Sequence, residues 1–282
     1  MALLTQEDAA RLSPLFKGKG GKLIYKLLCK ITSLDALSTV YDANCSHRGA
    51  DFATKTLEYL KTDYLIGGYD KLSDLPQGAF ITISNHPYGG VDGLVLVDLF
   101  GRIRGDYKVM VNKILGLLEA LSPSTITVTP TGNEKTSPTS ESLRGVRLAM
   151  QHVREGHPLG LFPSGAVSDL SLKERAIRDR EWQEGVIRMI RKLEVPVVPV
   201  RFFDRNSLYY YLLGLIDWRV RLTRLCREGI NKGGKRVRVG IGDIIPPSRI
   251  KDFADTASLG AFLRSSVYDM PLPADFIKRS SL

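Results

Sequence analysis

Cysteine and long apolar runs are scarce in this sequence, and each scarcity removes a class of protein. Cys29, Cys45 and Cys226 are odd in number, lie far apart and form no CxxC pair, so a reducing compartment is favoured over a disulfide framework. No uncharged apolar run approaches the roughly 18 residues of a membrane-spanning helix, and the longest candidate, residues 207–216, is too short. Residues 1–16 contain no apolar core between basic flanks, so we expect no secretory signal. A chain of this kind that meets a membrane is expected to lie on its surface.

Acidic residues are outnumbered by basic ones. The 282 residues include 40 Lys and Arg against 30 Asp and Glu, which gives a net charge of +10. Such an excess favours an anionic partner, which would be nucleic acid, an anionic membrane surface or an acidic substrate. The hydrophobic fraction of 43% and the charged fraction of 25% are ordinary for a folded chain with a sizeable core.

The pattern of apolar residues changes near residue 60. Residues 1–60 are predicted to form an amphipathic helical segment, because apolar positions recur at helical spacing in residues 23–31. Lys22, Lys26 and Lys30 follow one face of that helix. Two interpretations stay open for it: a solvated helix packed on the main domain, or a helix that faces a membrane.

Residues 61–282 are predicted to form an α/β domain. Short apolar and β-branched runs predict strands, which alternate with helical patterns and indicate a mixed, mostly parallel sheet flanked by helices. The predicted strands are residues 79–84, 107–112, 125–129, 159–162, 195–202 and 236–241. The predicted helices begin near Asp92 and at Lys113, span residues 140–154 and 181–192, and include a C-terminal tail. The biased stretch 129–142 is predicted to be an exposed loop.

The most informative stretch is SNHPYGGVDG, residues 84–93, which follows a predicted strand and opens a predicted helix. Five residues separate His86 from Asp92, and Gly89 and Gly90 allow the tight turn that would bring the two side chains together. A carboxylate beside one imidazole nitrogen leaves the other nitrogen as a base, and a helix start offers backbone N–H groups to a developing oxyanion. The competing interpretation is an N-capping Asp beside a histidine in a turn.

Two further blocks occur at equivalent places along the predicted sheet. FPSG, residues 162–165, follows one strand, and VPVVPV, residues 195–200, lies on the next. In this order, the three blocks resemble the glycerol-phosphate acyltransferase superfamily, which includes the 1-acylglycerol-3-phosphate acyltransferases. The family pattern is NHxxxxD, FPEGTRS and a VPVVPV-like strand. The matching residues are Asn85, His86, Asp92, Phe162, Pro163, Gly165, Ser168, Val195, Pro196, Val197, Pro199 and Val200.

The resemblance implies an enzyme that transfers a fatty acyl group. His86 would take the proton of an acceptor hydroxyl, and Asp92 would orient His86 and stabilise its positive charge. The acyl donor would be a thioester of coenzyme A or acyl carrier protein, with no bound cofactor, metal or acyl-enzyme. The residues expected to contact substrate are Asn85, Gly89, Gly90, Phe162, Pro163, Ser164, Gly165, Ser168, Arg175, Arg178 and Arg180.

The sequence departs from the family pattern at four places. The interval between His86 and Asp92 is one residue longer, Ser164 replaces Glu, and Pro130 and Val167 stand where arginines that read phosphate are expected. The missing arginines argue against a simple phosphate-bearing acceptor, although arginines just downstream of the FPSG block could substitute.

This variant, together with REWQ at residues 180–183, resembles a bacterial subgroup that includes the O-acyltransferases of ornithine and glycine lipids. The predicted function is therefore acylation of a lysolipid hydroxyl, with a lyso-aminolipid preferred. One alternative is a 1-acylglycerol-3-phosphate acyltransferase that makes phosphatidic acid. An alternative of another class is a non-enzymatic basic protein that binds lipid or nucleic acid.

Other site chemistries are disfavoured. A serine hydrolase needs G-x-S-x-G, but Phe162 and Ala166 flank Ser164, which is expected to be a turn residue or an acceptor contact. The four histidines show no metal-ligand spacing, and His152 and His157 are expected on the surface.

A basic cluster at residues 219–238 holds eight Lys or Arg and one acid, Glu228. It is open to three interpretations: nucleic-acid binding, a solvated face, or a membrane face formed with the apolar and aromatic residues 208–216. We prefer the membrane face and expect no nucleic-acid partner. The protein is expected to be cytoplasmic and peripheral on the inner face of the cell membrane.

Overall fold

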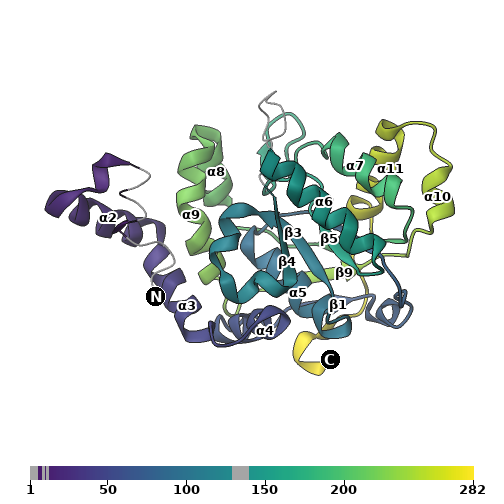
Figure 1. Cartoon of the computed structure of the whole chain (residues 1–282), viewed down its shortest axis with the longest axis horizontal. Coiled ribbons are helices and arrows are strands. Elements are labelled where there is room, and N and C mark those ends of the chain that lie inside the picture. The colour runs from purple at the N-terminus through teal and green to yellow at the C-terminus, as the bar shows by residue number, and fades with distance from the viewer. Residues whose placement is uncertain (1–5, 8–9, 11–12, 129–139) are drawn as a thin grey trace.

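The first N-terminal helices project from the body of the protein, whereas the last one packs against it (Figure 1). The structure is a computed structural model that describes residues 6–7, 10, 13–128 and 140–282. A short 3₁₀ turn at Pro14–Phe16 precedes α2 (Gly18–Thr32), α3 (Leu34–Asn44) and α4 (Gly49–Tyr59). Figure 1 shows α2 at the far left, separated from the sheet, whereas α4 lies directly beneath the body. The predicted helical character of this segment is thus confirmed for its described part.

A mixed sheet forms the centre of the protein. Its strand order is β10-β1-β9-β8-β2-β5-β3-β4. Every pair from β8 through β2, β5 and β3 to β4 is parallel, as is β1 with β9, whereas β8 with β9 and β1 with β10 are antiparallel. The predicted α/β fold with a mostly parallel sheet is confirmed. The strands are β1 (Leu65–Gly67), β2 (Ile81–Ser84), β3 (Lys108–Asn112), β4 (Thr125–Val128), β5 (Leu159–Leu161), β8 (Val197–Phe202), β9 (Arg238–Ile241) and β10 (Ile277–Lys278).

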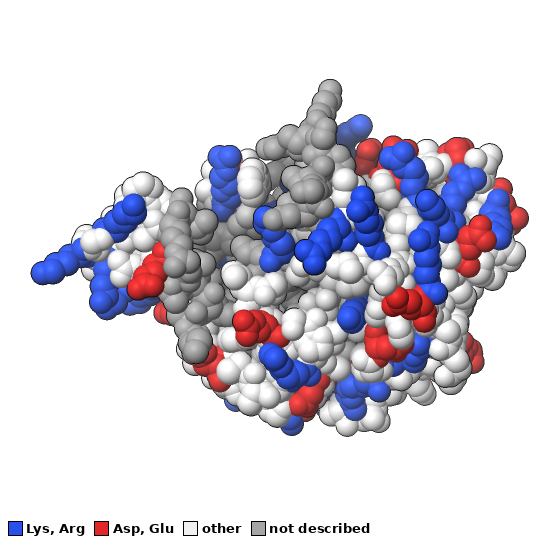
Figure 2. Space-filling model, viewed as in Figure 1, with Lys and Arg blue, Asp and Glu red and all other residues white. Residues whose placement is uncertain are grey.

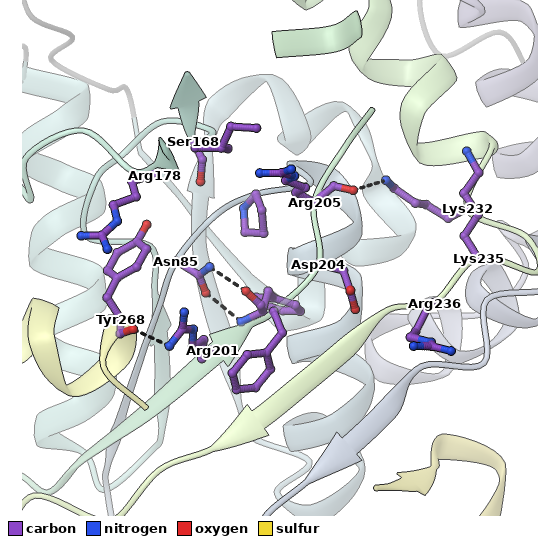
Figure 3. A pocket seen from close by; sticks show the side chains of 14 residues that line it. Asn85, Ser168, Arg178, Arg201, Asp204, Arg205, Lys232, Lys235, Arg236 and Tyr268 are labelled. Atoms are coloured by element: carbon purple, nitrogen blue, oxygen red, sulfur yellow. Dashed lines mark hydrogen bonds between the residues drawn. The ribbon is translucent and has the colours of Figure 1, made fainter. Parts of the chain in front are cut away.

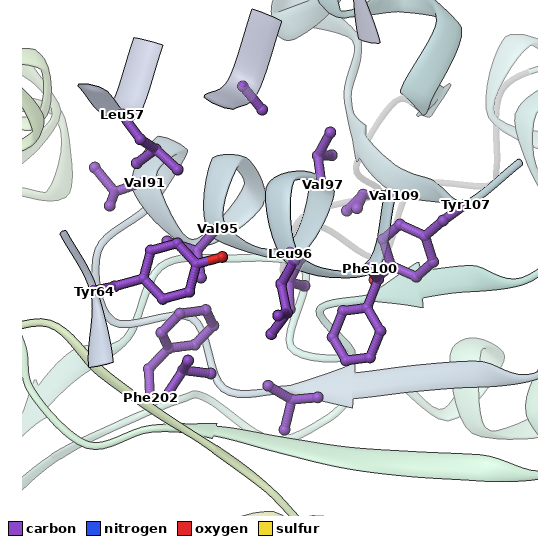
Figure 4. Packing of buried hydrophobic residues seen from close by; sticks show 14 of the residues in the cluster. Leu57, Tyr64, Val91, Val95, Leu96, Val97, Phe100, Tyr107, Val109 and Phe202 are labelled. Carbon is purple, nitrogen blue, oxygen red and sulfur yellow. The ribbon is translucent and has the colours of Figure 1, made fainter. Parts of the chain in front are cut away.

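Helices cover both faces of the sheet, because parallel strands need crossover connections and bury both of their faces. One apolar cluster joins α4 and α5 to the sheet, and a second joins α6, α7 and α11 to the opposite face. Figure 4 shows the first cluster, in which Val95, Leu96 and Phe100 of α5 pack with Tyr64 and Phe202. The helices that follow α4 are α5 (Gly90–Ile103), α6 (Ser140–Arg154), α7 (Glu184–Leu193), α8 (Leu208–Ile216), α9 (Trp218–Ile230), α10 (Pro247–Lys251) and α11 (Thr256–Tyr268).

The C-terminus is tied to the core through a buried carboxylate. Asp98 of α5 is fully buried and accepts hydrogen bonds from Arg279 Nε at 2.7 Å, from Tyr64 Oη at 2.7 Å and from Thr54. A buried charge needs such partners, because its hydration is lost. The last residues of the chain therefore hold the outer face of α5 in place.

The structure corrects two predictions. The helix expected from Lys113 is absent, and 3₁₀ turns at Lys113–Leu117 and Glu119–Ser124 take its place. Pro123 inside the second turn has no backbone N–H, which disfavours a continuing α-helix. His152 is not on the surface: it is buried, and its Nε2 lies 3.2 Å from the carbonyl oxygen of Pro158.

One prediction falls largely outside the described residues, and one short element was not predicted. The loop expected at residues 129–142 falls largely outside the described residues. The hairpin of β6 (Asp169–Ser171) and β7 (Ala176–Arg178) was not predicted, because three-residue strands carry too little periodicity to be recognised.

Candidate active site

His86 and Asp92 meet at the carboxyl end of β2. His86 follows the strand in a turn, and Asp92 lies in the first turn of α5. Nδ1 of His86 is 2.9 Å from Oδ2 of Asp92, although the ring N–H is not aligned for a regular hydrogen bond. Such contacts in ligand-free sites are often imperfect and tighten when substrate binds. The side chain of His86 is 18% exposed, so Nε2 belongs to a ring that solvent can reach.

Gly89 makes the longer interval between the two residues possible. Its backbone has φ +84° and ψ −121°, a conformation that L side chains rarely adopt. A Cβ atom at this position would also lie 3.0 Å from Leu225 and 3.3 Å from Val167. At Gly90, in contrast, an added Cβ would meet nothing within 4 Å. The extra residue is therefore absorbed at Gly89, and Gly90 simply begins the helix.

The carboxylate of Asp92 is completely buried. Oδ2 accepts the backbone N–H groups of Tyr88 at 2.9 Å and Gly89 at 3.0 Å. Burial raises the pKa of Asp92, and the contact with His86 and these two N–H groups oppose that shift. Asp92 thus accepts the backbone N–H groups at the start of α5 and also contacts His86. The capping interpretation and the His–Asp pair are therefore both compatible with the structure.

Hydrogen bonds to β8 and α8 fix the backbone on either side of His86. Asn85 exchanges two hydrogen bonds with the main chain of Phe202 on β8, with Nδ2 to O at 2.9 Å and N to Oδ1 at 2.8 Å. Tyr211 donates from Oη to the carbonyl of Pro87 at 2.9 Å. Asn85 therefore fixes the turn to the next strand, and its expected contact with substrate stays a prediction.

Asp179 is a site residue that the sequence did not reveal. It is buried, and its Oδ1 accepts the backbone N–H of His86 at 3.1 Å and the hydroxyl of Ser168 at 2.6 Å. Ser168 also donates its backbone N–H to the carbonyl of His86 at 2.9 Å. Burial raises the pKa of Asp179, which these hydrogen bonds oppose. The only sequence signal was its place directly before the REWQ block.

The FPSG block forms a tight turn against the His86 ring. The Phe162 and His86 rings stack with centroids 4.0 Å apart. Gly165 has φ +66° and donates its N–H to the carbonyl of Phe162 at 2.9 Å. Gln183 then holds the turn through its backbone N–H to Pro163 O at 2.9 Å.

Ser164 in this turn is buried, and its hydroxyl donates to the carbonyl of Ala166 at 2.8 Å. Ser164 is therefore a turn residue, which was one of its two interpretations; a contact with the acceptor stays a prediction.

The three predicted arginines are dispersed. Arg175 occupies the exposed turn of the β6–β7 hairpin with φ +50°. Arg180 pairs with Asp169, which also binds the buried Arg221 of α9. Arg178 alone of the three lines the cavity described next. Val167 and Pro130 occupy the two positions where arginines that read phosphate are expected. Val167 lies close to Gly89, and Pro130 lies outside the described residues.

A basic cavity of about 530 Å³ opens beside the His86 turn. Figure 3 shows Arg178 and Tyr268 on one side of it, Lys232 and Lys235 on the other, and Asn85 between them. The other lining residues are Pro87, Ser168, Ile177, Arg201, Phe202, Phe203, Asp204, Arg205 and Arg236. The loop between α9 and β9 brings three of the eight basic residues of the 219–238 cluster to this cavity: Lys232, Lys235 and Arg236.

Metal-ligating clusters and membrane-spanning helices are both absent from the described part of the chain. No group of three or more His, Cys, Asp or Glu residues there could hold a metal ion. None of the helices described is both long and apolar enough to cross a membrane.

These features define a class of protein: an α/β chain in which a histidine lies beside a buried carboxylate at the carboxyl edge of the parallel strands. An acyltransferase family model matches residues 46–272. The chain therefore belongs to the acyltransferase family, and the predicted resemblance is confirmed.

Two curated relatives are similar over nearly their whole length, and both are named lyso-glycine lipid O-acyltransferase. That of Bacteroides thetaiotaomicron is 26% identical over 257 residues, covering 88% of this chain and 90% of the relative. That of Phocaeicola vulgatus is 26% identical over 274 residues, covering 92% of this chain and 94% of the relative. A crystal structure of the 1-acyl-sn-glycerophosphate (LPA) acyltransferase PlsC from Thermotoga maritima aligns with a TM-score of 0.48 and 15% identity, covering 88% of this chain and 95% of that one.

Proposed function

We propose that this acyltransferase moves a fatty acyl group from a thioester to the hydroxyl of a lysolipid, with His86 as the general base. The observation that carries the proposal is the contact of His86 Nδ1 with the fully buried carboxylate of Asp92. A carboxylate in this place keeps the proton on Nδ1 and leaves Nε2 to accept one.

The reaction needs no covalent enzyme intermediate. Nε2 of His86 takes the hydroxyl proton of the acceptor while its oxygen attacks the thioester carbonyl. The C–S bond then breaks, and the leaving thiolate of coenzyme A or of the carrier protein takes the proton from the His86 imidazolium, which restores the neutral base. Asp92 stabilises the imidazolium that forms between these events. The backbone N–H groups of Tyr88 and Gly89 already bind Asp92, so stabilisation of the oxyanion falls to other donors.

The proposed acceptor is a lyso-aminolipid of the glycine-lipid type rather than lysophosphatidic acid. The names and coverage of the two curated relatives support this choice. The sequence supports it too, because Val167 and Pro130 replace the expected phosphate-reading arginines. Arg180, a candidate to hold the headgroup carboxylate, is engaged by Asp169 and would have to exchange partners to do so.

A competition assay tests the function and the acceptor together. Purified protein receives one acyl thioester and equal amounts of lyso-glycine lipid and lysophosphatidic acid, and products are separated by mass. We expect acylated glycine lipid to dominate and His86→Ala to abolish both products while circular dichroism stays unchanged. Full turnover by a folded His86→Ala protein would contradict the proposed role of His86. Faster acylation of lysophosphatidic acid than of lyso-glycine lipid would contradict the proposed acceptor.

We further propose that the protein reaches its lipid substrate by lying on an anionic membrane through α2 and α8. Leu23, Leu27 and Ile31 form one stripe of α2, spaced one helical turn apart and 71%, 58% and 59% exposed. Figure 2 shows basic side chains on the projecting α2 region, which suits an anionic surface. On α8, Leu212 and Ile216 are exposed as well.

Vesicle sedimentation tests this surface. Leu27→Asp should weaken binding to anionic vesicles by about tenfold or more, the value of losing one inserted leucine. Leu272→Asp is the matched control, because Leu272 is 54% exposed and lies outside α2 and α8. Equal losses in both variants, or tighter binding of the wild type to nucleic acid than to lipid, would contradict the proposed membrane face.

A further inference from the structure

The basic cavity beside the His86 turn has a marked excess of positive charge. Six of its lining residues are cations, and Asp204 is the single acid among them: the cations are Arg178, Arg201, Arg205, Lys232, Lys235 and Arg236. Asp204 is already neutralised, because Arg238 binds both of its oxygens at 2.9 and 2.6 Å. The cavity therefore presents uncompensated positive charge to whatever enters it.

Two of these cations have no carboxylate partner among the described residues, Lys232 on one side of the cavity and Arg201 on the other (Figure 3). Lys232 is 3% exposed, and its Nζ contacts only the carbonyl of Arg205, at 3.5 Å, and the Tyr88 ring, at 4.3 Å from its centroid. Arg201 donates to the carbonyls of Met270, at 2.6 Å, and Tyr268. None of the described carboxylates forms an ion pair with either side chain.

Burying a lysine in this way is unfavourable unless an anion compensates it. Burial lowers the pKa of Lys232 to about 8, which Glu228 and Asp92 partly oppose. At neutral pH the ammonium group is still mostly protonated. A bound anion would restore the lost stabilisation of this charge.

The cavity lies on the opposite side of β2 from the reacting nitrogen. His86 stacks on Phe162, which follows β5, whereas Asn85 and Pro87 face the end of β8. The cavity therefore suits the distant end of a long substrate. Both kinds of acyl donor have such an end, because the thioester sulfur of coenzyme A and of acyl carrier protein terminates a phosphopantetheine arm whose other end is a phosphate.

We propose that the basic cavity binds the phosphate of the acyl donor's phosphopantetheine arm, with Lys232 on one side of the cavity and Arg201 and Arg178 on the other (Figure 3). A phosphate accepts several charge-assisted hydrogen bonds, and the wall formed by Phe203, Ile177 and other apolar side chains suits the adjoining arm. The glycine headgroup of the acceptor carries only one carboxylate charge. Six cations line the cavity, so the headgroup alone would leave most of their charge unpaired. This inference rests on the proposed function, since it names the site of that reaction's donor.

Calorimetry with coenzyme A, 4′-phosphopantetheine and pantetheine tests the proposal without an acceptor. The wild type should bind the two phosphate-bearing probes and bind pantetheine weakly. Lys232→Met should lower the affinity for both by about ten- to a hundredfold, as expected for a charge-assisted hydrogen bond. Lys192→Met, which removes an exposed lysine from α7, is the matched control and should bind as the wild type does.

Lys232→Met is expected to fold, because it replaces a buried charge by an apolar side chain of similar length; circular dichroism and thermal melting check this. If it fails to fold, Arg178→Gln at the exposed rim should still weaken binding by about threefold or more, a smaller effect because solvent screens an exposed charge. Unchanged affinity of the folded variant, or equal binding of pantetheine and phosphopantetheine, would overturn the proposal.

Steady-state kinetics separates the two substrates. Lys232→Met should raise KM for the donor with kcat nearly preserved, and a rise in KM for the acceptor alone would assign the cavity to the headgroup and overturn the proposal. Parallel assays with acyl-coenzyme A and acyl carrier protein identify the source of the phosphate. Failure of the proposed function is distinguishable, because His86→Ala should still bind coenzyme A, and this binding would stand even if no acyl transfer were found.

Discussion

Replacing Asp92 by Asn tests how much the buried carboxylate contributes to catalysis. The substitution keeps the size of the side chain and an oxygen that can accept the N–H groups of Tyr88 and Gly89. It removes the negative charge 2.9 Å from His86 Nδ1 and offers an amide donor there instead. Both changes disfavour the tautomer that leaves Nε2 free, and they leave the imidazolium without a counter-charge.

The magnitude follows from the separation and the burial. Unit charges at about this distance attract by about 4–6 kcal/mol when the effective dielectric constant is about 20. This attraction exists only once His86 is protonated during the reaction, so it lowers the barrier without strengthening the ground state. Its loss corresponds to a decrease in kcat of roughly a thousand- to ten-thousandfold.

The assay measures single-turnover acyl transfer at saturating donor, with circular dichroism as the check on folding. Asp106→Asn is the matched control, because Asp106 lies beyond the far end of α5 and pairs with Arg104 and His157 instead. It should retain wild-type kcat. A folded Asp92→Asn protein that keeps kcat within about tenfold of the wild type would refute the charge argument, since tenfold is only about 1.4 kcal/mol.

Three further outcomes are expected. Burial raises the pKa of Asp92 above the ordinary Asp value of about 3.9, so protonation of this group favours the folded state. Its contribution to the free energy of unfolding should therefore rise as the pH falls through this raised pKa, and urea unfolding of Asp92→Asn should lack that contribution. Gly89→Ala should lower the free energy of unfolding in urea by about 1–3 kcal/mol, owing to its positive φ, whereas Gly90→Ala should leave it nearly unchanged. Arg279→Met should cost about 3–5 kcal/mol by stranding the buried Asp98 charge, and adding Asp98→Asn should recover part of that loss; equal stability of the single and double variants would contradict this reasoning.

The sequence by itself determined the elements that depend on local pattern. The apolar runs of β2, β3, β5 and β8 and the periodicity of α6 are visible without any contact, because strand and helix periods differ. The pairing of His86 with Asp92 was also predictable, since both lie in one short turn whose glycines permit it. What pattern could not give was the 3₁₀ path after Lys113, because tertiary context overrides the local preference for helix there.

Only the tertiary structure decided which distant side chains share the site. Asp179 reaches the His86 backbone from 93 residues away, across a hairpin too short to be recognised. Lys232 and Arg201 line one cavity because β8 and β9 pair antiparallel, so that the loop before β9 lies beside the end of β8. The charge of a residue does not reveal whether its side chain faces solvent or lines a cavity, because burial depends on long-range contacts. The basic cluster therefore had three open interpretations, and only the fold placed Lys232, Lys235 and Arg236 at the cavity.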